Sequence, residues 1–245
     1  MKNGSLEIMR HLKLTGMADA YEAALGLPLN QQAETHEMIA HLIDAEKQHR
    51  WHKRMNMFLR LSKLRYQATI QDIDCSPNRN LSREKLMLLA DCAYLDRAEN
   101  LLITGATGCG KSFLACAIGN SACVKGYRTL YFNMNRFTEQ IALAKTDGSL
   151  IKWMNRLKKA KLLIFDDFGL QAISHQVKLI LLQILEDRYE IDSIIICSQL
   201  PVSKWHEYFD EPTLADAILD RIIPKAHRIE LEGKSLRKPI NQLNS

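Results

Sequence analysis

The sequence predicts an α/β fold: a parallel sheet with helices on both faces, preceded by a small all-helical domain. Three observations indicate this fold. From residue 100 onward short apolar runs alternate with helical patterns, a glycine-rich loop joins the first run to a helix, and the first 68 residues show helical periodicity alone. Alternation of this kind is typical of a parallel sheet, because the crossover helices cover both of its faces.

The N-terminal part is expected to hold three helices. An amphipathic segment opens at Leu6, and residues 17–25 form a second one that ends at Gly26. Apolar residues at helical spacing then predict a long helix from Thr35 to about Arg65. We therefore expect a helical domain at residues 1–68.

A linker and the sheet domain are expected to follow. Residues 69–82 contain Pro77 among aspartates and asparagines, a composition typical of an irregular connection. The sheet domain then covers residues 83–245 and opens with one more helix at 83–95. Strands are expected at 100–104, 129–133, 161–165, 193–197 and 227–231, and helices at 111–124, 135–145, 150–159, 175–189 and 214–224.

Composition narrows the class of protein. The chain has 245 residues, of which 47% are apolar, and a net charge of +5 that is too small by itself to prove nucleic-acid binding. It has no apolar run long enough to span a bilayer and no signal-peptide pattern. Its six cysteines form no C-x-x-C pair, so we expect neither a zinc site nor a disulfide framework. A cytoplasmic protein that does not associate with membranes is the expectation.

The most specific motif is the glycine-rich loop. It fits the phosphate-binding pattern G-x-x-x-x-G-K-[ST] and has the required strand before it and helix after it. Its residues are Gly105, Ala106, Thr107, Gly108, Cys109, Gly110, Lys111 and Ser112. Backbone N–H groups and the helix N-terminus attract phosphate, Lys111 can reach the β and γ phosphates, and Ser112 can hold Mg²⁺. The alternative is an ordinary glycine turn before a helix.

Two carboxylates follow the third expected strand. Asp166 and Asp167 end an apolar run, which is the form of a Walker B motif, and the carboxyl end of that strand lies beside the phosphate loop in such sheets. Asp166 is expected to bind Mg²⁺, and Asp167 to orient or deprotonate the attacking water. The alternative is a simple acidic turn.

Three further residues are candidates for the catalytic machinery. Ser198 and Gln199 end the fourth expected strand, where a polar group can contact the γ-phosphate or the water. The alternative for both is a strand-end turn. Arg221 lies near the end of the helix at 214–224 and is either an arginine finger for a neighbouring subunit or part of a surface salt bridge with Asp220 or Asp216.

The long N-terminal helix carries a basic segment. Lys and Arg on one side of a helix can contact DNA phosphates without reading base sequence. The candidate DNA contacts are Arg50, Lys53, Arg54, Arg60 and Lys63, and the C-terminal residues Lys234, Arg237 and Lys238 add positive charge. The alternative is a solvated helix face.

Together these segments resemble the IstB-like ATP-binding proteins, the helper ATPases of a class of bacterial insertion sequences. The resemblance covers nearly the whole chain, and its most specific part runs from 186 to 238. The matching segments are 105–112, 163–169, 186–189, 198–201, 216–222, 227–231 and 233–238. It implies a P-loop AAA+ fold related to the helicase loader DnaC and the initiator DnaA. It also implies ATP and Mg²⁺ as cofactors, assembly as a homo-oligomer on double-stranded DNA with little sequence specificity, and a partner transposase in DNA transposition.

Two positions depart from the family pattern. Cys109 stands where Thr is usual, and Asp167 stands where AAA+ proteins usually carry Glu, so ATP hydrolysis is expected to be slow. The chain ends shortly after Arg237, so no C-terminal lid is expected. Two other functions stay open: a replicative helicase loader of the DnaC type, and an assembly protein with negligible turnover. A small-molecule kinase lacks an acceptor-binding motif.

Overall fold

The computed structural model describes residues 2–28 and 33–236. It divides into two compact units, Met1–Met57 and Phe58–Ser245, and the point of division falls within helix α3 (Thr35–Ser62). The division of the chain at residues 68 and 82 stays a prediction about domains. No helix in the described ranges is long and apolar enough to cross a membrane.

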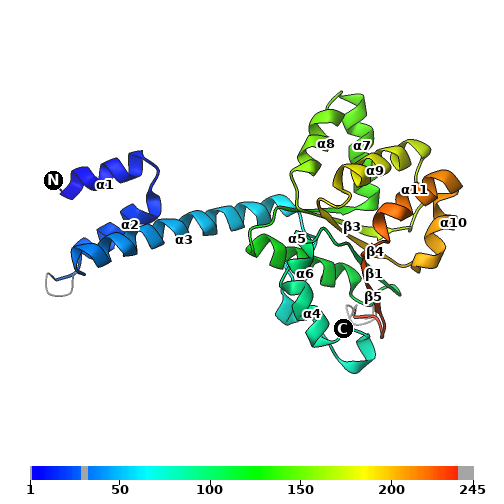
Figure 1. Ribbon diagram of the computed structural model, residues 1–245, viewed down its shortest axis with the longest axis horizontal. Coiled ribbons are helices and arrows are strands. Elements are labelled where there is room, and N and C mark those ends of the chain that lie inside the picture. The colour runs from blue at the N-terminus through cyan, green and yellow to red at the C-terminus, as the bar shows by residue number, and fades with distance from the viewer. Residues whose placement is uncertain (1, 29–32, 237–245) are drawn as a thin grey trace, which may run out of the picture. The chain divides into compact units, whose positions relative to one another are not determined.

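The first unit is a small helical assembly. It holds α1 (Lys2–His11), α2 (Thr15–Leu25) and the first part of α3 (Figure 1). The start of α2 lies very close to α3, because a Cβ atom at Gly16 would meet the carbonyl oxygen of Ala45 at 2.6 Å. Only glycine fits such an approach without a shift of the backbone. The apolar core of this unit is small: among its described residues, the buried apolar side chains are those of Ala18, Ala24 and Leu42.

The second unit contains a five-stranded sheet. All of its paired strands are parallel, and their order is β2-β3-β4-β1-β5. The strands are β1 (Leu101–Gly105), β2 (Thr129–Asn133), β3 (Leu162–Phe168), β4 (Ser193–Ser198) and β5 (His227–Leu231). Each of the five strand predictions is confirmed, with small differences at the ends.

Helices cover both faces of this sheet, as the sequence predicts (Figure 1). One face carries α4 (Arg83–Ala90), α5 (Ala93–Asp96) and α6 (Lys111–Val124). The other carries α7 (Met134–Thr146), α8 (Leu150–Lys158), α9 (His175–Arg188), α10 (Trp205–Phe209) and α11 (Pro212–Ile222).

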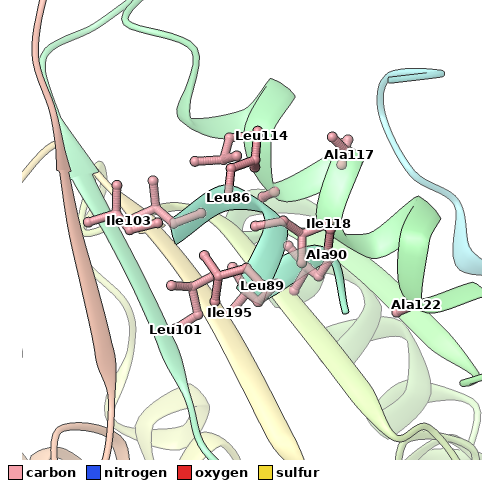
Figure 2. Close-up of a cluster of buried hydrophobic side chains, with 14 of the residues drawn as sticks. Leu86, Leu89, Ala90, Leu101, Ile103, Leu114, Ala117, Ile118, Ala122 and Ile195 are labelled. Carbon is pink, nitrogen blue, oxygen red and sulfur yellow. The ribbon is translucent and has the colours of Figure 1, made fainter. Parts of the chain in front are cut away.

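Alternation along each strand produces the two cores. Leu101 and Ile103 of β1 pack under α4 and α6, as Figure 2 shows, whereas Leu102 between them belongs to the cluster on the other face. Leu86 of α4 and Ile118 of α6 close the first cluster over the strands.

Two segments differ in detail from the prediction. The helix expected at 83–95 divides into α4 and α5, because Cys92 takes a left-handed conformation with φ 64° that a continuous helix does not allow. The expected linker contains the short 3₁₀ helices η2 (Ile70–Asp72) and η3 (Pro77–Arg79), and a third, η4 (Val202–Lys204), follows β4. Ile70 and Leu81 are buried in the core of the second unit, so this segment packs on the sheet domain.

Candidate nucleotide-binding site

The phosphate loop joins β1 to α6 at the carboxyl end of the sheet (Figure 1). Gly105, Gly108 and Gly110 have φ values of 143°, 82° and 94°, which side chains rarely adopt. A Cβ atom at Gly105 would meet the carbonyl oxygen of Leu231 at 2.3 Å, so the loop also needs glycine for space. The helix α6 starts directly at Lys111, so its free N–H groups and positive dipole end lie at the loop.

Lys111 is held inside the loop. The side chain is buried, and its Nζ donates hydrogen bonds to the carbonyl oxygens of Gly105 and Ala106, each at 2.8 Å. These are neutral acceptors, and a phosphate oxygen is a stronger partner for an ammonium group. Lys111 is therefore placed to exchange loop carbonyls for a bound phosphate.

A pocket of about 320 Å³ opens beside this loop. Loop residues, one Walker B acid and one predicted strand-end residue line it together. The lining residues are Tyr66, Thr107, Gly108, Gly110, Lys111, Ser112, Phe113, Asp167, Gln199 and Leu236. Residues far apart in the sequence thus converge on one cavity at the phosphate loop.

Two segments outside the motif support the loop. Arg79, which is buried, donates a hydrogen bond to the carbonyl oxygen of Cys109, and the backbone N–H of Leu236 donates to the carbonyl oxygen of Gly108 at 3.0 Å. The thiol of Cys109 is itself fully buried, with its Sγ 4.0 Å from the Nζ of Lys111. Cys109 thus acts as a small inward-facing side chain, which explains why a cysteine is accepted in place of threonine.

The two Walker B acids lie at a bulge in β3. The register with β4 shifts between Phe165 and Phe168, and Asp167 has a φ of 57°. Aspartate tolerates this left-handed region better than most residues. The preference for aspartate at a left-handed position gives a physical reason for Asp167 in place of the glutamate that is usual in AAA+ proteins.

Each acid has a fixed partner from β2. Asp166 is buried and accepts a hydrogen bond from the hydroxyl of Tyr131 at 2.5 Å. Asp167 accepts one from the side-chain amide of Asn133 at 2.6 Å, while the amide oxygen of Asn133 caps α7 by accepting from the backbone N–H of Asn135. Since the cap fixes the orientation of this amide, its NH₂ group must face Asp167.

The electrostatics of the pair distinguish the two acids. Burial, and then the nearby charge of Asp166, raise the pKa of Asp167 above its ordinary value of 3.8. A carboxylate with a raised pKa accepts a proton more readily, which suits a group that orients or deprotonates water. The positive side chain of Arg65 also lies beside this pair.

The structure separates the two candidates at the end of β4. The side-chain oxygen of Gln199 accepts a hydrogen bond from the hydroxyl of Thr107 at 2.6 Å, which places Gln199 on the pocket. The hydroxyl of Ser198 is buried, donates to the carbonyl oxygen of Phe168 at 2.8 Å and accepts from the backbone N–H of Leu200. The Ser198 hydroxyl thus bonds to the backbone of β3 and of the turn after β4, and its catalytic role stays a prediction.

Arg221 lies at the opposite end of the sheet from the phosphate loop. Its backbone carbonyl accepts from the side chain of Asn100, which directly precedes β1, whereas the loop follows β1. Its guanidinium forms an ion pair with Glu186 at 2.9 Å, and not with Asp220 or Asp216. The five residues of β1 lie between Arg221 and the loop of the same chain, so Arg221 does not line the pocket at that loop.

The residues predicted to contact DNA differ in whether they form ion pairs within the chain. Lys53 and Arg54 of the first unit are exposed, whereas Arg50 forms an ion pair with the buried Glu46 at 2.6 Å. Arg60 and Lys63 are exposed in the second unit. Lys234 is also exposed, while Arg237 and Lys238 lie outside the described residues.

A second basic surface was not anticipated from the sequence. Four cations line a shallow groove at α8, near the points where β2 and β3 begin, and none of them forms an ion pair with another described residue. We call this the α8 basic surface; it comprises Arg128, Lys152, Arg156 and Lys159. Helical spacing of the last three could have indicated a shared face.

The residues present suit Mg²⁺ bound together with a nucleotide. No cluster of three or more His, Cys, Asp or Glu side chains that could hold a metal alone occurs within residues 2–28 and 33–236. The hydroxyl of Ser112 and the carboxylate of Asp166 are hard oxygen donors, and Mg²⁺ typically takes one or two protein ligands plus phosphate oxygens and water. The donor set therefore fits a metal that arrives with its phosphates.

Comparison with known proteins agrees with this geometry. The model of the family described as "IstB-like ATP binding protein" matches residues 8–243. The chain belongs to this family. It is 42% identical over 234 residues to insertion sequence ATP-binding protein y4pL of Sinorhizobium fredii, covering 96% of each chain. It is 27% identical over 230 residues to the IS21 ATP-binding protein of Pseudomonas aeruginosa, covering 94% of this chain and 87% of that protein.

Solved structures establish the AAA+ fold of this family member. DnaA of Aquifex aeolicus with bound AMPPCP aligns with a TM-score of 0.57 and 20% identity, over 69% of this chain and 51% of DnaA. The DnaC helicase loader aligns with a TM-score of 0.55 and 19% identity, over 68% of this chain and 98% of DnaC. At these identities the likeness shows the fold alone, and the predicted AAA+ sheet with its N-terminal helices is confirmed.

Proposed function

We propose that this IstB-like protein binds and hydrolyses ATP with Mg²⁺, assembles on double-stranded DNA and assists a partner transposase. The observation that carries the ATPase part is the convergence of Lys111, Asp167 and Gln199 on one pocket at the phosphate loop. The relatives in insertion sequences support the transposition context.

Each pocket residue has a specific task in this proposal. Loop N–H groups and Lys111 bind the phosphates, while Ser112 and Asp166 hold Mg²⁺, which neutralises charge on the transferred phosphate. Asp167 accepts a proton from, or orients, the attacking water, and Gln199 positions the same water or the γ-phosphate. Tyr131 and Asn133 keep the two carboxylates in place through their hydrogen bonds.

Arg221 supports an oligomeric mechanism. It lies at the amino end of the sheet, where it cannot serve the nucleotide of its own chain. Its side chain is partly exposed; the guanidinium pairs with Glu186 and donates a hydrogen bond to the carbonyl oxygen of Ala217. We propose that Arg221 acts in trans, as the arginine finger for a pocket in the neighbouring subunit.

Two exposed basic regions support binding to the DNA backbone. Lys53 and Arg54 lie on α3, and the α8 basic surface lies on the ATPase unit. Unpaired cations of this kind release counterions from DNA without reading bases, so little sequence specificity is expected.

The helicase-loader alternative shares the fold, so the likeness to DnaC does not favour it. The relative at 42% identity is an insertion sequence protein, which favours the transposition helper. Binding of a helicase in place of a transposase would support the alternative. An assembly protein with negligible turnover would form the same complexes without releasing phosphate.

Phosphate release tests the ATPase part directly. Wild type, Lys111→Ala and Asp167→Asn are incubated with ATP and Mg²⁺, with and without duplex DNA. We expect slow release that DNA stimulates in the wild type and that both substitutions abolish. Absence of release by the wild type with duplex DNA present would reject hydrolysis, and release unchanged in Lys111→Ala would reject this site.

A further inference from the structure

Arg65 is a charged residue at the site to which the proposed mechanism gives no task. Its Nη1 lies 3.6 Å from an oxygen of Asp167 and 4.0 Å from an oxygen of Asp166. The Arg65 side chain is 43% exposed, whereas that of Asp166 is 1% exposed. The guanidinium therefore reaches from a solvent-accessible position toward the two Walker B acids.

The neighbours of Arg65 direct it toward the nucleotide pocket. Its guanidinium carbon lies 5.4 Å from the ring centroid of Tyr66, a cation–π distance. Tyr66 in turn lines the pocket with Ser112 and packs against Phe113, with ring centroids 5.9 Å apart. Arg65 thus sits between an aromatic wall of the pocket and the two carboxylates.

The charges at this position change when the pocket fills. Arg65 stays protonated at any accessible pH, so it attracts whichever anion lies beside it in the pocket. With Mg²⁺ on the carboxylate of Asp166, the attraction between Arg65 and the acids is largely offset by the added positive charge. The terminal phosphate of a nucleotide is the new anion in the same pocket, and the planar fork of arginine matches phosphate oxygens.

We propose that Arg65 binds the terminal phosphate of ATP held by its own chain, and that it makes the site prefer ATP over ADP. This proposal rests on the proposed ATP binding. It differs from the role of Arg221, since Arg65 and the pocket belong to the same subunit.

The test compares two nucleotides. Isothermal titration calorimetry with Mg²⁺ measures the binding of ADP and of a non-hydrolysable ATP analogue to wild type, Arg65→Ala and Arg65→Lys. We expect Arg65→Ala to weaken the analogue about tenfold or more, the size of a charge-assisted contact, and to change ADP less than about twofold. Arg65→Lys keeps the charge without the fork and is expected between the two.

Two further variants serve as controls. Arg97→Ala removes an arginine of similar exposure, 57%, that pairs with Glu99 just before β1 at the other end of the sheet, and should leave both affinities unchanged. Tyr131→Phe removes the hydroxyl that bonds Asp166 and also contacts Arg65, but it keeps the Arg65 guanidinium itself. It should shift the Mg²⁺ requirement for both nucleotides and preserve their ratio.

The outcomes distinguish failure of the proposed role of Arg65 from failure of the proposed ATP binding. Equal weakening of both nucleotides by Arg65→Ala, or no weakening of either, overturns the role of Arg65 and leaves ATP binding intact. Failure of the wild type to bind either nucleotide overturns both proposals. Circular dichroism of Arg65→Ala confirms its fold, and Arg65→Lys supplies the same comparison if that variant does not fold.

Discussion

The two ends of the parallel sheet are built for different purposes. At the carboxyl end, the phosphate loop and the Walker B bulge place Lys111 and Asp167 around a cavity, with left-handed backbone at both segments. At the amino end, Arg188 is buried and donates hydrogen bonds to four carbonyl oxygens, which belong to Leu157, Ala160, Lys161 and Ser193. The carboxyl end thus leaves room for a ligand, whereas at the amino end Arg188 ties neighbouring segments of the chain together.

Two acids show the same contrast in their pKa values. Burial and the charge of Asp166 raise the pKa of Asp167 at the carboxyl end. At the amino end, hydrogen bonds from Arg97 and His227 lower the pKa of Glu99 to about 2, although burial opposes this. The fold therefore stabilises the charge of Glu99 and disfavours that of Asp167, which is what a structural and a catalytic carboxylate respectively require.

The comparison has a functional consequence. The amino end also carries Arg221 and the α8 basic surface, whose cations are directed to partners outside the chain in our proposal. One end of the sheet would then hold the nucleotide, while the other would meet a neighbouring subunit and DNA.

The largest expected effect is on the rate of phosphate release, and it distinguishes a lysine at the carboxyl end of the sheet from one at the amino end. Lys111→Ala removes the ammonium that lies in the loop, and we expect phosphate release to fall roughly 10²-fold or more. Lys161→Ala, at the start of β3, removes contacts to Ile191 and Asp192 and should leave the rate within about twofold. Comparable losses in the two variants would contradict the division of tasks.

Arg188→Ala tests whether the buried hydrogen bonds of Arg188 stabilise the amino end of the sheet. Loss of Arg188 removes one donor from each of four carbonyl oxygens, of which those of Leu157 and Lys161 keep a backbone donor, and we expect the free energy of unfolding to fall by at least about 3 kcal/mol. Urea denaturation measures this change, with the exposed Arg97 as a control for a surface arginine. A loss below about 1 kcal/mol would show that the hydrogen bonds of Arg188 contribute little to the stability of the protein.

The α8 basic surface offers a moderate effect. The double variant Lys152→Ala, Arg156→Ala should weaken duplex DNA binding and reduce the slope of log K against log salt by about 2, since each phosphate contact contributes roughly 0.9. Nucleotide affinity should not change, because these residues do not line the pocket. An unchanged salt slope would remove this surface from the DNA interface.

The smallest expected effect is a difference in the pH dependence of stability. The native pKa of Asp167 is raised, so its contribution to stability is largest below its ordinary value of 3.8 and is lost as pH rises through the native value. Asp167→Asn should therefore raise the melting temperature at pH 7, with the gain vanishing in acid.

The contribution of Glu99 to stability has the opposite pH dependence. Its contribution to stability is present above its ordinary pKa of 4.5 and is lost as pH falls toward about 2. Glu99→Gln should therefore lower the melting temperature at pH 7 and have no effect near pH 2. Melting curves of both variants across this range check the two signs, and equal signs at pH 7 would contradict the contrast between the ends.

Local patterns in the sequence predicted the sheet well. Each strand is a short apolar run, and Gly105 to Ser112 fit a motif that can be recognised from consecutive residues. Asn133 is the last residue of β2, and polar residues at the carboxyl ends of parallel strands lie at the ligand-binding edge of the sheet. Its place at the site could therefore have been predicted by the reasoning used for Asp166.

Tyr131, Arg65 and Arg79 could not have been predicted in this way. They come from segments with no motif of their own, and only the folded chain brings them to the acids and to the loop. The different contacts of Ser198 and Gln199 likewise depend on tertiary packing: Ser198 ends β4 and bonds to Phe168, whereas Gln199 follows the strand and bonds to Thr107. The strand-end pattern leaves this difference undecided.

A mixing experiment tests the central claim, that a pocket at the carboxyl end of one chain is completed by Arg221 from the amino end of another. Phosphate release on duplex DNA is measured for Lys111→Ala, for Arg221→Ala and for their equimolar mixture. Each variant alone should be inactive. The mixture should recover up to about a quarter of the wild-type rate, because random head-to-tail assembly joins an intact pocket to an intact Arg221 at that fraction of interfaces. A mixture of Arg221→Ala with the double variant should recover nothing. A mixture as inactive as its components, or activity in Arg221→Ala alone, would contradict the account.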